Sequence, residues 1–449
     1  MNLLPENNFY KQILKLALPA IAGLSTQMIV SLVDAAIVGR LHDAEYTLSA
    51  MGIGVLITWA LVSFFSSFST GTQVITARRF GIKNYSECGN VLNNSMLLFF
   101  SIGIIVAAIA MYFAHDIPYI FTSNPMVAHY AGEFIFFRFI GIPFFLLSVA
   151  YRGFFFGINK TKIFMFSAII TNVLNIVFNY VLVFGKLGIS PMGVAGSGLG
   201  STLATTTDFL FYFIVTILPR YAKKYEYFKH FKIDKTIIKN IFKISLPVSF
   251  QNVFILIGFL SFMGIIGKNL GPENQAATQA CISTLFLSFL PCFGFGIAVQ
   301  TLVGNNLGAG KVKLAKIYGY ETAKIATYYT LFLAIIYIFF PQWVLIIITN
   351  NQHIIDIATN PLRIAGFAQI FYATGVVLAN GLQSGGKTLF VMLAESITNL
   401  GIFVPLVFLF VHIFNFSLVG AWAALPIYII LYAVVIFWKF RKEKWEEVF

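Results

Sequence analysis

The chain has 449 residues, of which 58% are hydrophobic and 10% are charged, and its mean hydropathy is +0.83. Ordinary soluble domains contain about a quarter charged residues, so this composition excludes a soluble globular protein. The net charge of +13 does not indicate nucleic-acid binding, because the basic residues gather in alternate connections between hydrophobic segments, as in membrane proteins. We therefore expect a lipid bilayer around the chain and no nucleic-acid partner.

Apolar segments long enough to cross roughly 30 Å of hydrocarbon as helices recur along the whole length. They predict an all-α polytopic membrane protein with twelve transmembrane helices. The approximate helix cores are 14–38, 48–76, 89–113, 128–155, 163–186, 193–218, 238–267, 275–303, 314–340, 355–382, 388–412 and 419–439. The first segment has no evident cleavage site, so we expect it to remain as an anchor.

Lysine and arginine are distributed unevenly between the two sets of connections. The N-terminus, the connections after helices 2, 4, 6, 8 and 10, and the C-terminus are basic, whereas the opposite set holds Arg40, Lys186 and Lys268. Basic connections stay on the cytoplasmic side, so both termini are expected in the cytoplasm and the protein in the plasma (inner) membrane. The basic stretch 219–242 is predicted to be a cytoplasmic linker, with lipid headgroups as an alternative partner.

The two halves of the chain resemble each other at a spacing of about 227 residues. The paired positions include Pro19 and Pro247, Gly81 and Gly308, Arg138 and Arg363, Asn175 and Asn399, and Gly196 and Gly420. Six helices in each half give both halves the same orientation, so we predict a parallel repeat. The expected domains are an N-lobe at 1–218 with helices 1–6, the linker at 219–242, and a C-lobe at 243–449 with helices 7–12 and a short tail.

Three helices of the first half carry polar stripes inside apolar segments. The stripes are Gln27, Ser31 and Asp34 on helix 1, Asn172, Asn175 and Asn179 on helix 5, and Ser201, Thr205 and Asp208 on helix 6. Spacings of three and four residues place each set on one helix face. A charged group in hydrocarbon costs roughly 2.5–3.5 kcal/mol and usually marks an ion or substrate pathway. The stripes therefore predict a hydrated polar pocket.

The chemistry of these stripes suits a small cation. A carboxylate, amide carbonyls and hydroxyls form an oxygen-only shell for a hard ion such as Na⁺, with Asp34 as its candidate ligand. A desolvated aspartate can instead carry a proton, so the sequence leaves H⁺ and Na⁺ both open. The cation-coupling candidates are Asp34, Asn175, Asn179, Thr205 and Asp208, and the substrate-facing candidates are Gln27, Ser31 and Asn172. Structural roles, with asparagines bridging packed helices and Asp208 bonded to a hydroxyl, are the alternative.

Several further motifs together resemble multidrug and toxic compound extrusion (MATE) transporters over about residues 10–440. They are ALP and SLVDAAIVGRL in helix 1, the turns around Gly81 and Gly308, FFFGINKTK, LQSGGKTLF, NVLNIVFNYVLVFG and GVAGSGLGSTLAT. The resemblance implies two pseudo-symmetric six-helix bundles around a central cleft. It also implies export of organic, often cationic, compounds in exchange for Na⁺ or H⁺.

Within this family, the resemblance is closer to the DinF-like than to the NorM-like branch. It implies that Asp34 is the cation-responsive residue and that Gln27 lies near substrate. Asn179 stands where several relatives carry a second acid, and we infer that Asp208 substitutes for it. The NorM-like branch carries acids in helices 7 and 10, where this chain has Ile255 and the Tyr372–Ala373 pair.

Other polar residues receive structural interpretations or remain open. Pro19 and Pro247 are expected to open helices 1 and 7, and Pro19 is a candidate hinge because proline removes a backbone hydrogen bond. We interpret Glu395 as snorkelling to the cytoplasmic interface and Arg152 as a cation at the membrane edge. Arg138, Lys324 and Arg363 are likewise expected near span ends.

The sequence thus predicts a secondary antiporter for amphipathic, cationic organic compounds, without a cofactor and active as a monomer. A flippase for a lipid-linked sugar precursor is the alternative, but it needs several cleft cations to hold a diphosphate. An intramembrane enzyme is the remote alternative, since the histidines fall in loops or at span ends and no HExxH or GxSxG motif occurs. No Walker motif indicates an ATP-driven pump.

Overall fold

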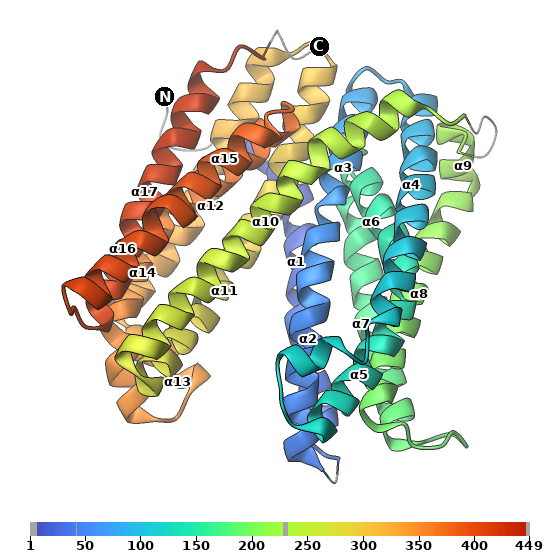
Figure 1. The fold of residues 1–449 in the computed structure, drawn as a ribbon. Coiled ribbons are helices and arrows are strands. Elements are labelled where there is room, and N and C mark those ends of the chain that lie inside the picture. Colours follow the sequence, from blue (N-terminus) through green and yellow to red (C-terminus); the bar gives the residue numbers. More distant parts are fainter. Residues whose placement is uncertain (1–6, 42, 228–231, 446–449) are drawn as a thin grey trace. The chain divides into compact units, whose positions relative to one another are not determined.

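The computed structural model of the protein describes residues 7–41, 43–227 and 232–445 (Figure 1). Helices make up the regular structure, and these ranges contain no strand, which confirms the predicted all-α class. The α-helices are α1 Asn7–Val38, α2 Ala44–Ser66, α3 Phe68–Gly81, α4 Tyr85–Tyr112, α5 Pro125–Ile140, α6 Ile142–Gly157, α7 Thr161–Phe184, α8 Gly193–Ile217, α9 Pro219–Tyr225, α10 Lys235–Leu270, α11 Pro272–Gly308, α12 Val312–Phe339, α13 Pro341–Ile348, α14 Gln352–Ser384, α15 Thr388–Thr398, α16 Val404–Phe408 and α17 Leu418–Lys442. The 3₁₀-helix η1 is Ile117–Ile120, and the π-helices are η2 Asn399–Phe403 and η3 Leu409–Ile413.

The lengths and compositions of these helices agree with the predicted spans. Ten candidate spans are long and apolar enough to cross a membrane, or up to twelve if each of two bent helix pairs is one span. The bent pairs are α5 with α6, at 49°, and α8 with α9, at 73°. With the α5–α6 pair counted as one span and α8 as the sixth, the helices follow the predicted order.

The bend between α5 and α6 has a local cause in the sequence. Pro143 lacks the N–H that would continue the helical bonding across the break. At Gly141 an added Cβ would lie 2.8 Å from the Thr202 hydroxyl oxygen, so glycine allows α8 to approach the break closely. Because the break falls midway along Pro125–Gly157, residues on the last turn of α5 lie far from both ends of this span.

The chain divides into two compact units, of which one is a single segment of the sequence and the other combines two segments. The N-terminal unit is residues 22–249, and the C-terminal unit is residues 1–21 together with 250–449. In the N-terminal unit α7 packs along α8, α2 along α5, and α3 and α4 against α6. In the C-terminal unit α11, α12 and α17 pack around α14. Each unit has its own apolar core.

Both unit boundaries fall inside long helices, which differs from the predicted lobes. The first boundary follows Ile21 within α1, and the second follows Ser249 within α10. Pro19 and Pro247 lie inside these helices, each two residues before a boundary. The expectation that they open their helices is wrong, because α1 is already helical at Asn7 and α10 begins at Lys235.

The predicted linker at 219–242 packs with the N-terminal unit rather than standing apart. Asn93 of α4 donates to the carbonyl oxygen of Tyr227, and Asn94 donates to the carbonyl of Lys232 at 2.9 Å. The Asn94 side-chain oxygen also accepts from the backbone N–H of Asp234 at 2.8 Å. Buried amides thus fix the segment to α4. Residues 228–231 of the predicted linker lie outside the described residues.

Candidate functional site

Hydrogen bonds join three of the predicted polar stripes in the N-terminal unit. Asn179 of α7 donates to the Asp34 carboxylate of α1 at 2.6 Å and to the Asn175 side-chain oxygen at 3.2 Å. Asn175 in turn donates to the Ser201 hydroxyl of α8 at 3.2 Å. With Thr205 and Arg138, these residues form what we call the Asp34 network. The structure therefore brings together four of the five predicted coupling residues.

The geometry of the Asp34 network follows from helix periodicity and one glycine. Asn175 and Asn179 lie one turn apart on the same face of α7, and they are 6% and 0% exposed. An added Cβ at Gly200 would lie 3.1 Å from the Asn179 side-chain Cγ and would clash with its Oδ1 atom. Glycine at this position therefore lets α8 pack closely against the Asn179 side chain of α7.

Arg138 is the member of the Asp34 network that sequence reasoning missed. Its Nη1 atom donates to the Ser201 carbonyl at 3.2 Å and to the Thr205 hydroxyl at 3.0 Å, and its charge interacts with that of Asp34. Arg138 lies on the last turn of α5, next to the mid-span bend, so its placement near a span end is wrong. The glycine and proline at 141 and 143 were the signal that could have located it.

Asp208 belongs to a second polar cluster rather than to the Asp34 network. Its carboxylate accepts from the Ser167 hydroxyl and, at 3.4 Å, from the Thr171 hydroxyl, both on α7. Its electrostatic partner is Arg152 of α6, whose buried Nε and Nη2 atoms have no hydrogen-bond partner among the described residues. Arg152 is therefore opposed by an acid inside the unit, which corrects its assignment as a membrane-edge cation.

The substrate-facing candidates occupy the neighbouring part of α1 and α7. Asn172 donates to the Thr26 hydroxyl at 2.6 Å, and this threonine was not predicted from the sequence. The Ser31 hydroxyl donates to the backbone carbonyl of Gln27 at 3.1 Å, and both Ser31 and Gln27 are exposed. Asn172 is thus tied to α1, whereas the Gln27 side chain is exposed, and contact of these residues with substrate stays a prediction.

The C-terminal unit contains a buried acid that sequence reasoning placed wrongly. Glu395 of α15 is 3% exposed, and its carboxylate accepts a hydrogen bond from the Tyr428 hydroxyl of α17. Snorkelling to the interface is excluded by this burial, because α17 packs over the face of α15 that carries the glutamate. The sequence contained no direct signal for this, since burial depends on which neighbouring helix covers that face.

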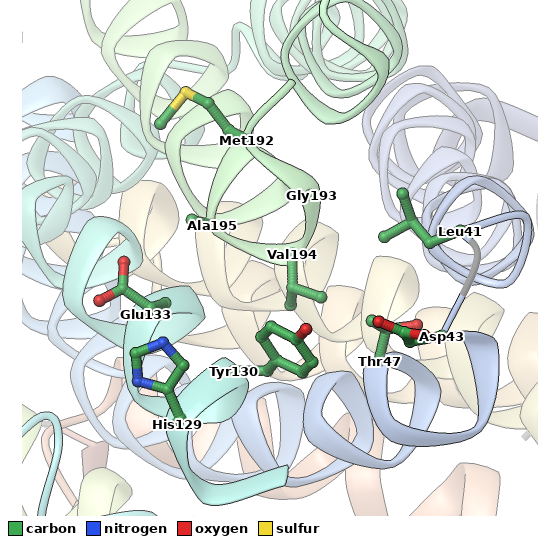
Figure 2. A pocket seen from close by; sticks show the side chains of 10 residues that line it. All are labelled: Leu41, Asp43, Thr47, His129, Tyr130, Glu133, Met192, Gly193, Val194 and Ala195. Atoms are coloured by element: carbon green, nitrogen blue, oxygen red, sulfur yellow. The ribbon is translucent and has the colours of Figure 1, made fainter. Parts of the chain in front are cut away.

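A separate cavity of about 390 Å³ opens in the N-terminal unit (Figure 2). Figure 2 shows His129 and Glu133 of α5 on one side, Asp43 and Thr47 near the start of α2 on the other, and Tyr130 between them. Leu41 and the first residues of α8, with Met192 before them, complete the lining. Within the described ranges no group of three or more His, Cys, Asp or Glu side chains is placed to hold a metal ion.

The repeat and the fold find direct counterparts among known proteins. A family model described as MatE matches this chain twice, at residues 19–181 and at 247–409. The two matches are displaced by 228 residues (247 minus 19, and 409 minus 181), which confirms the internal repeat. The chain belongs to the MatE family, and it is a multi-span integral membrane protein.

Curated relatives and solved structures agree with this membership. A probable multidrug resistance protein NorM of Thermotoga maritima is 27% identical over 97% of this chain and 93% of its own length. The probable multidrug resistance protein YoeA of Bacillus subtilis is 21% identical over 91% and 88%.

A MOP superfamily transporter from Pyrococcus furiosus has the same fold, with a TM-score of 0.89 and 19% identity over 98% of this chain and 96% of that one. An outward-facing multidrug resistance MATE transporter also gives 0.89, at 20% identity over the same shares. The predicted fold is thereby confirmed. The DinF-like branch remains a prediction, because these comparisons do not separate the two branches.

Proposed function

We propose that this protein is a secondary active antiporter that exports amphipathic, cationic organic compounds in exchange for H⁺ or Na⁺. The observation that carries the proposal is the Asp34 carboxylate, held by the Asn179 amide within a network of buried asparagines and hydroxyls. Such a constellation in an apolar helix bundle is costly unless it serves an ion or a ligand. Relatives named as multidrug resistance proteins support efflux of small organic compounds.

In this proposal Asp34 binds the cation and its neighbours complete the shell. The Oδ1 atom of Asn179 is buried against Gly200 without a hydrogen-bond partner among the described residues, so the amide has to turn before this oxygen can reach a cation at Asp34. Arg138 already places a positive charge near Asp34. An entering cation must therefore weaken this attraction, and Arg138 retains the Ser201 carbonyl and the Thr205 hydroxyl as its partners.

Cation binding and substrate binding are coupled if each favours a different state of the same equilibrium. A cation that prefers one state then lowers the affinity for a substrate that prefers the other, and the linkage is reciprocal. Pro19 is the proposed hinge, because it interrupts the bonding of α1 two residues before the unit boundary. Gln27, Ser31 and Asn172 are the proposed substrate contacts.

The topology and surroundings proposed for the protein follow from charge. Basic connections on one side support cytoplasmic termini and a plasma (inner) membrane location.

A monomer is proposed, since each unit has its own core and polar site. The flippase alternative is weaker, because Arg138 and Arg152 each face an aspartate and are not free to hold a diphosphate. We propose no enzymatic activity and no cofactor.

The test is efflux of ethidium from loaded proteoliposomes, with Na⁺ and pH gradients imposed separately. Asp34→Asn keeps the hydrogen-bonding shape but removes the charge, so we expect gradient-driven efflux to fall at least about tenfold, a loss of about 1.4 kcal/mol in coupling free energy. Asp116→Asn, at an exposed aspartate, is the matched control and should transport normally. Full gradient-driven transport by Asp34→Asn would refute the proposal.

A further inference from the structure

The buried acid of the C-terminal unit lies in a shell of hydroxyl and amide groups. The Glu395 carboxylate accepts from the Tyr428 hydroxyl, and Tyr432, Asn399 and Gln251 also lie within interaction range of it. Tyr428 and Tyr432 come from α17, Gln251 from α10, and Asn399 is one turn after Glu395 on the same helix face. Three helical segments therefore converge on a single carboxyl group.

Two polar atoms of this shell are buried without a hydrogen-bond partner among the described residues. They are the Asn399 Oδ1 atom and the Tyr432 hydroxyl, in residues that are 4% and 3% exposed. A buried polar atom without a partner is costly, by about 1–3 kcal/mol, so a shell that keeps two of them is unusual for a purely structural contact. The Asn399 Oδ1 atom lies against Gly258 of α10, whereas the Asn399 amide acts as a donor toward Glu395.

The backbone beside this shell departs from regular α-helix. Asn399–Phe403 forms a π-helical turn that begins one turn after Glu395. Such turns are rare, cost stability and are frequent at functional sites, because they redirect side chains. Here the π-helical turn begins at the residue whose Oδ1 atom has no donor, and the Asn399 side chain packs directly against Gly258 of α10.

A chain of buried amides connects this shell with the other helices of the unit. Gln300 of α11 donates to Gln383 of α14 at 3.4 Å, and Gln383 donates to Gln251 at 3.1 Å. These glutamines are 2%, 4% and 7% exposed. Gln383 is next to the last residue of α14, at the end predicted to face the cytoplasm. The amides thus mark a polar route from that end to Glu395.

Nothing cationic neutralises Glu395 within the described part of the chain. No lysine, arginine or histidine there forms an ion pair with it, and the titratable groups that face it are hydroxyls: Tyr372 of α14 and Tyr428 and Tyr432 of α17. A lone buried carboxylate is unfavourable unless it is paired or protonated. We propose that Glu395 is a second ion site of this protein and that it takes up and releases a proton.

A proton fits this shell better than Na⁺. Tyr428 already uses its hydroxyl as a donor toward the carboxylate, whereas a metal ion requires oxygen atoms that turn their lone pairs toward it. Apolar residues such as Val391, Ala394 and Phe403 are buried in the same segment and supply no ligands. The shell therefore favours a proton shared between a carboxyl group and polar neighbours.

The first experiment detects this proton without any transport. Infrared difference spectra of the purified protein are recorded across pH in an Asp34→Asn background, which removes the other proposed coupling acid. A protonated-carboxyl band that disappears on alkalinisation is expected there, and the double variant Asp34→Asn/Glu395→Gln should lose it. Glu273→Gln, at a glutamate whose side chain is 65% exposed, is the matched control and should keep the band.

Two outcomes of this experiment would overturn the proposal. One is that the spectra with and without Glu395 are the same at every pH. The other is that adding Na⁺ at constant pH abolishes the band, which would make Glu395 a sodium ligand. If Glu395→Gln does not fold, Tyr428→Phe serves instead. Loss of the donated hydrogen bond disfavours the carboxylate, so the band should persist to more alkaline pH, and an unchanged titration contradicts the proposal.

The second experiment rests on the proposed antiport function. In proteoliposomes, the substrate gradient at equilibrium is measured against the imposed pH gradient, and its slope reports the protons exchanged per substrate. We expect a lower slope for Glu395→Gln, while Glu273→Gln keeps the original slope. An unchanged slope with intact transport overturns the second site but not the antiporter. If the unaltered protein exports nothing, the antiporter proposal fails and the infrared result still decides the proton site.

Discussion

The buried acids of the two units are neutralised in different ways. In the N-terminal unit Asp34 lies near Arg138 and Asp208 faces Arg152, so each acid has a permanent cation nearby. Among the described residues of the C-terminal unit, the polar groups that face Glu395 are hydroxyls and amides. An arginine in a protein does not release its proton, so a fixed positive charge stays near each acid of the first unit. The second unit must take its neutralising charge from outside.

Equivalent positions of the repeat carry different polar residues in the two units. Asn175 and Asn399 are equivalent positions of the repeat, 224 residues apart (399 minus 175). The same displacement makes Thr171 the equivalent of Glu395 (395 minus 171). Thr171 donates to an acid on the next long helix, α8, whereas Glu395 accepts from a hydroxyl on the next long helix, α17. In the N-terminal unit the hydroxyl is therefore on the first helix of the pair and the acid on the second. In the C-terminal unit the acid is on the first helix and the hydroxyl on the second.

The equivalent arginines have also diverged. Arg363, which pairs with Arg138 in the repeat, is exposed and donates to the Ile338 carbonyl at 3.1 Å and to Asn360 at 3.2 Å. The two spans also differ in shape, since α14 runs unbroken from Gln352 to Ser384, whereas its counterpart is broken at Gly141. Arg138 bonds two residues of the neighbouring helix α8, whereas Arg363 stays at the surface of its unit.

The largest expected effect comes from separating an acid from its arginine. Arg152→Leu leaves Asp208 buried without a cation, so we expect the free energy of unfolding to fall by about 3–5 kcal/mol. The double variant Arg152→Leu/Asp208→Leu should regain most of this loss, because no buried charge remains. Unfolding is measured in detergent. Arg363→Leu, at the exposed arginine, is the control, and a loss as small as in this control would contradict the pairing.

An intermediate effect is expected at the glycines that make room for the two asparagines. Gly200→Ala would push on Asn179, and Gly258→Ala would place a Cβ 2.8 Å from the Asn399 side-chain Cγ, so each should cost about 1–3 kcal/mol of stability. If the units differ as proposed, the first substitution weakens coupling through Asp34 and the second shifts the infrared titration of Glu395.

Controls for these substitutions exist on the same kind of helix. At Gly52 and Gly264 an added Cβ meets nothing within 4 Å, so alanine there should stabilise the helix by about 0.5–1 kcal/mol. The measurement is again unfolding in detergent. If all four substitutions have the same sign and size, the close approaches at Gly200 and Gly258 do not matter.

The smallest effect concerns the contacts that hold the linker segment in the N-terminal unit and the end of α17 in the C-terminal unit. The N-terminal unit uses the neutral amides of Asn93 and Asn94, whereas the C-terminal unit uses charges: Glu443 bonds Lys387 at 3.1 Å and Lys439 at 2.9 Å. Burial acts to raise the pKa of Glu443, but the hydrogen bonds and charges of these lysines outweigh it and hold the pKa below its usual range.

This lowered pKa predicts a stability that depends on pH. A group whose folded pKa is depressed stabilises the protein above its unfolded pKa of about 4.3, and this contribution is lost as pH falls through the folded pKa. Glu443→Gln should therefore cost about 1 kcal/mol at neutral pH, and the difference from the unaltered protein should vanish in acid. Thermal unfolding across pH checks this. A difference that is constant with pH would contradict the ion pairs.

The sequence by itself determined the features that depend on local composition and spacing. Hydropathy located the spans, the paired prolines, glycines and asparagines revealed the repeat, and helical spacing placed Asn175 and Asn179 on one face of their helix. These predictions succeed because apolar length and helix periodicity are properties of a single segment.

Only the tertiary structure decided which charges are buried and what they face. Arg138 and Arg152 were assigned to span ends and Glu395 to the interface, yet all three face partners inside their units. The outcome depended on a bend at Gly141, on glycines that let helices approach, and on the helix that covers each face. A residue's surroundings are supplied by segments far away in the chain, so no local pattern specifies them.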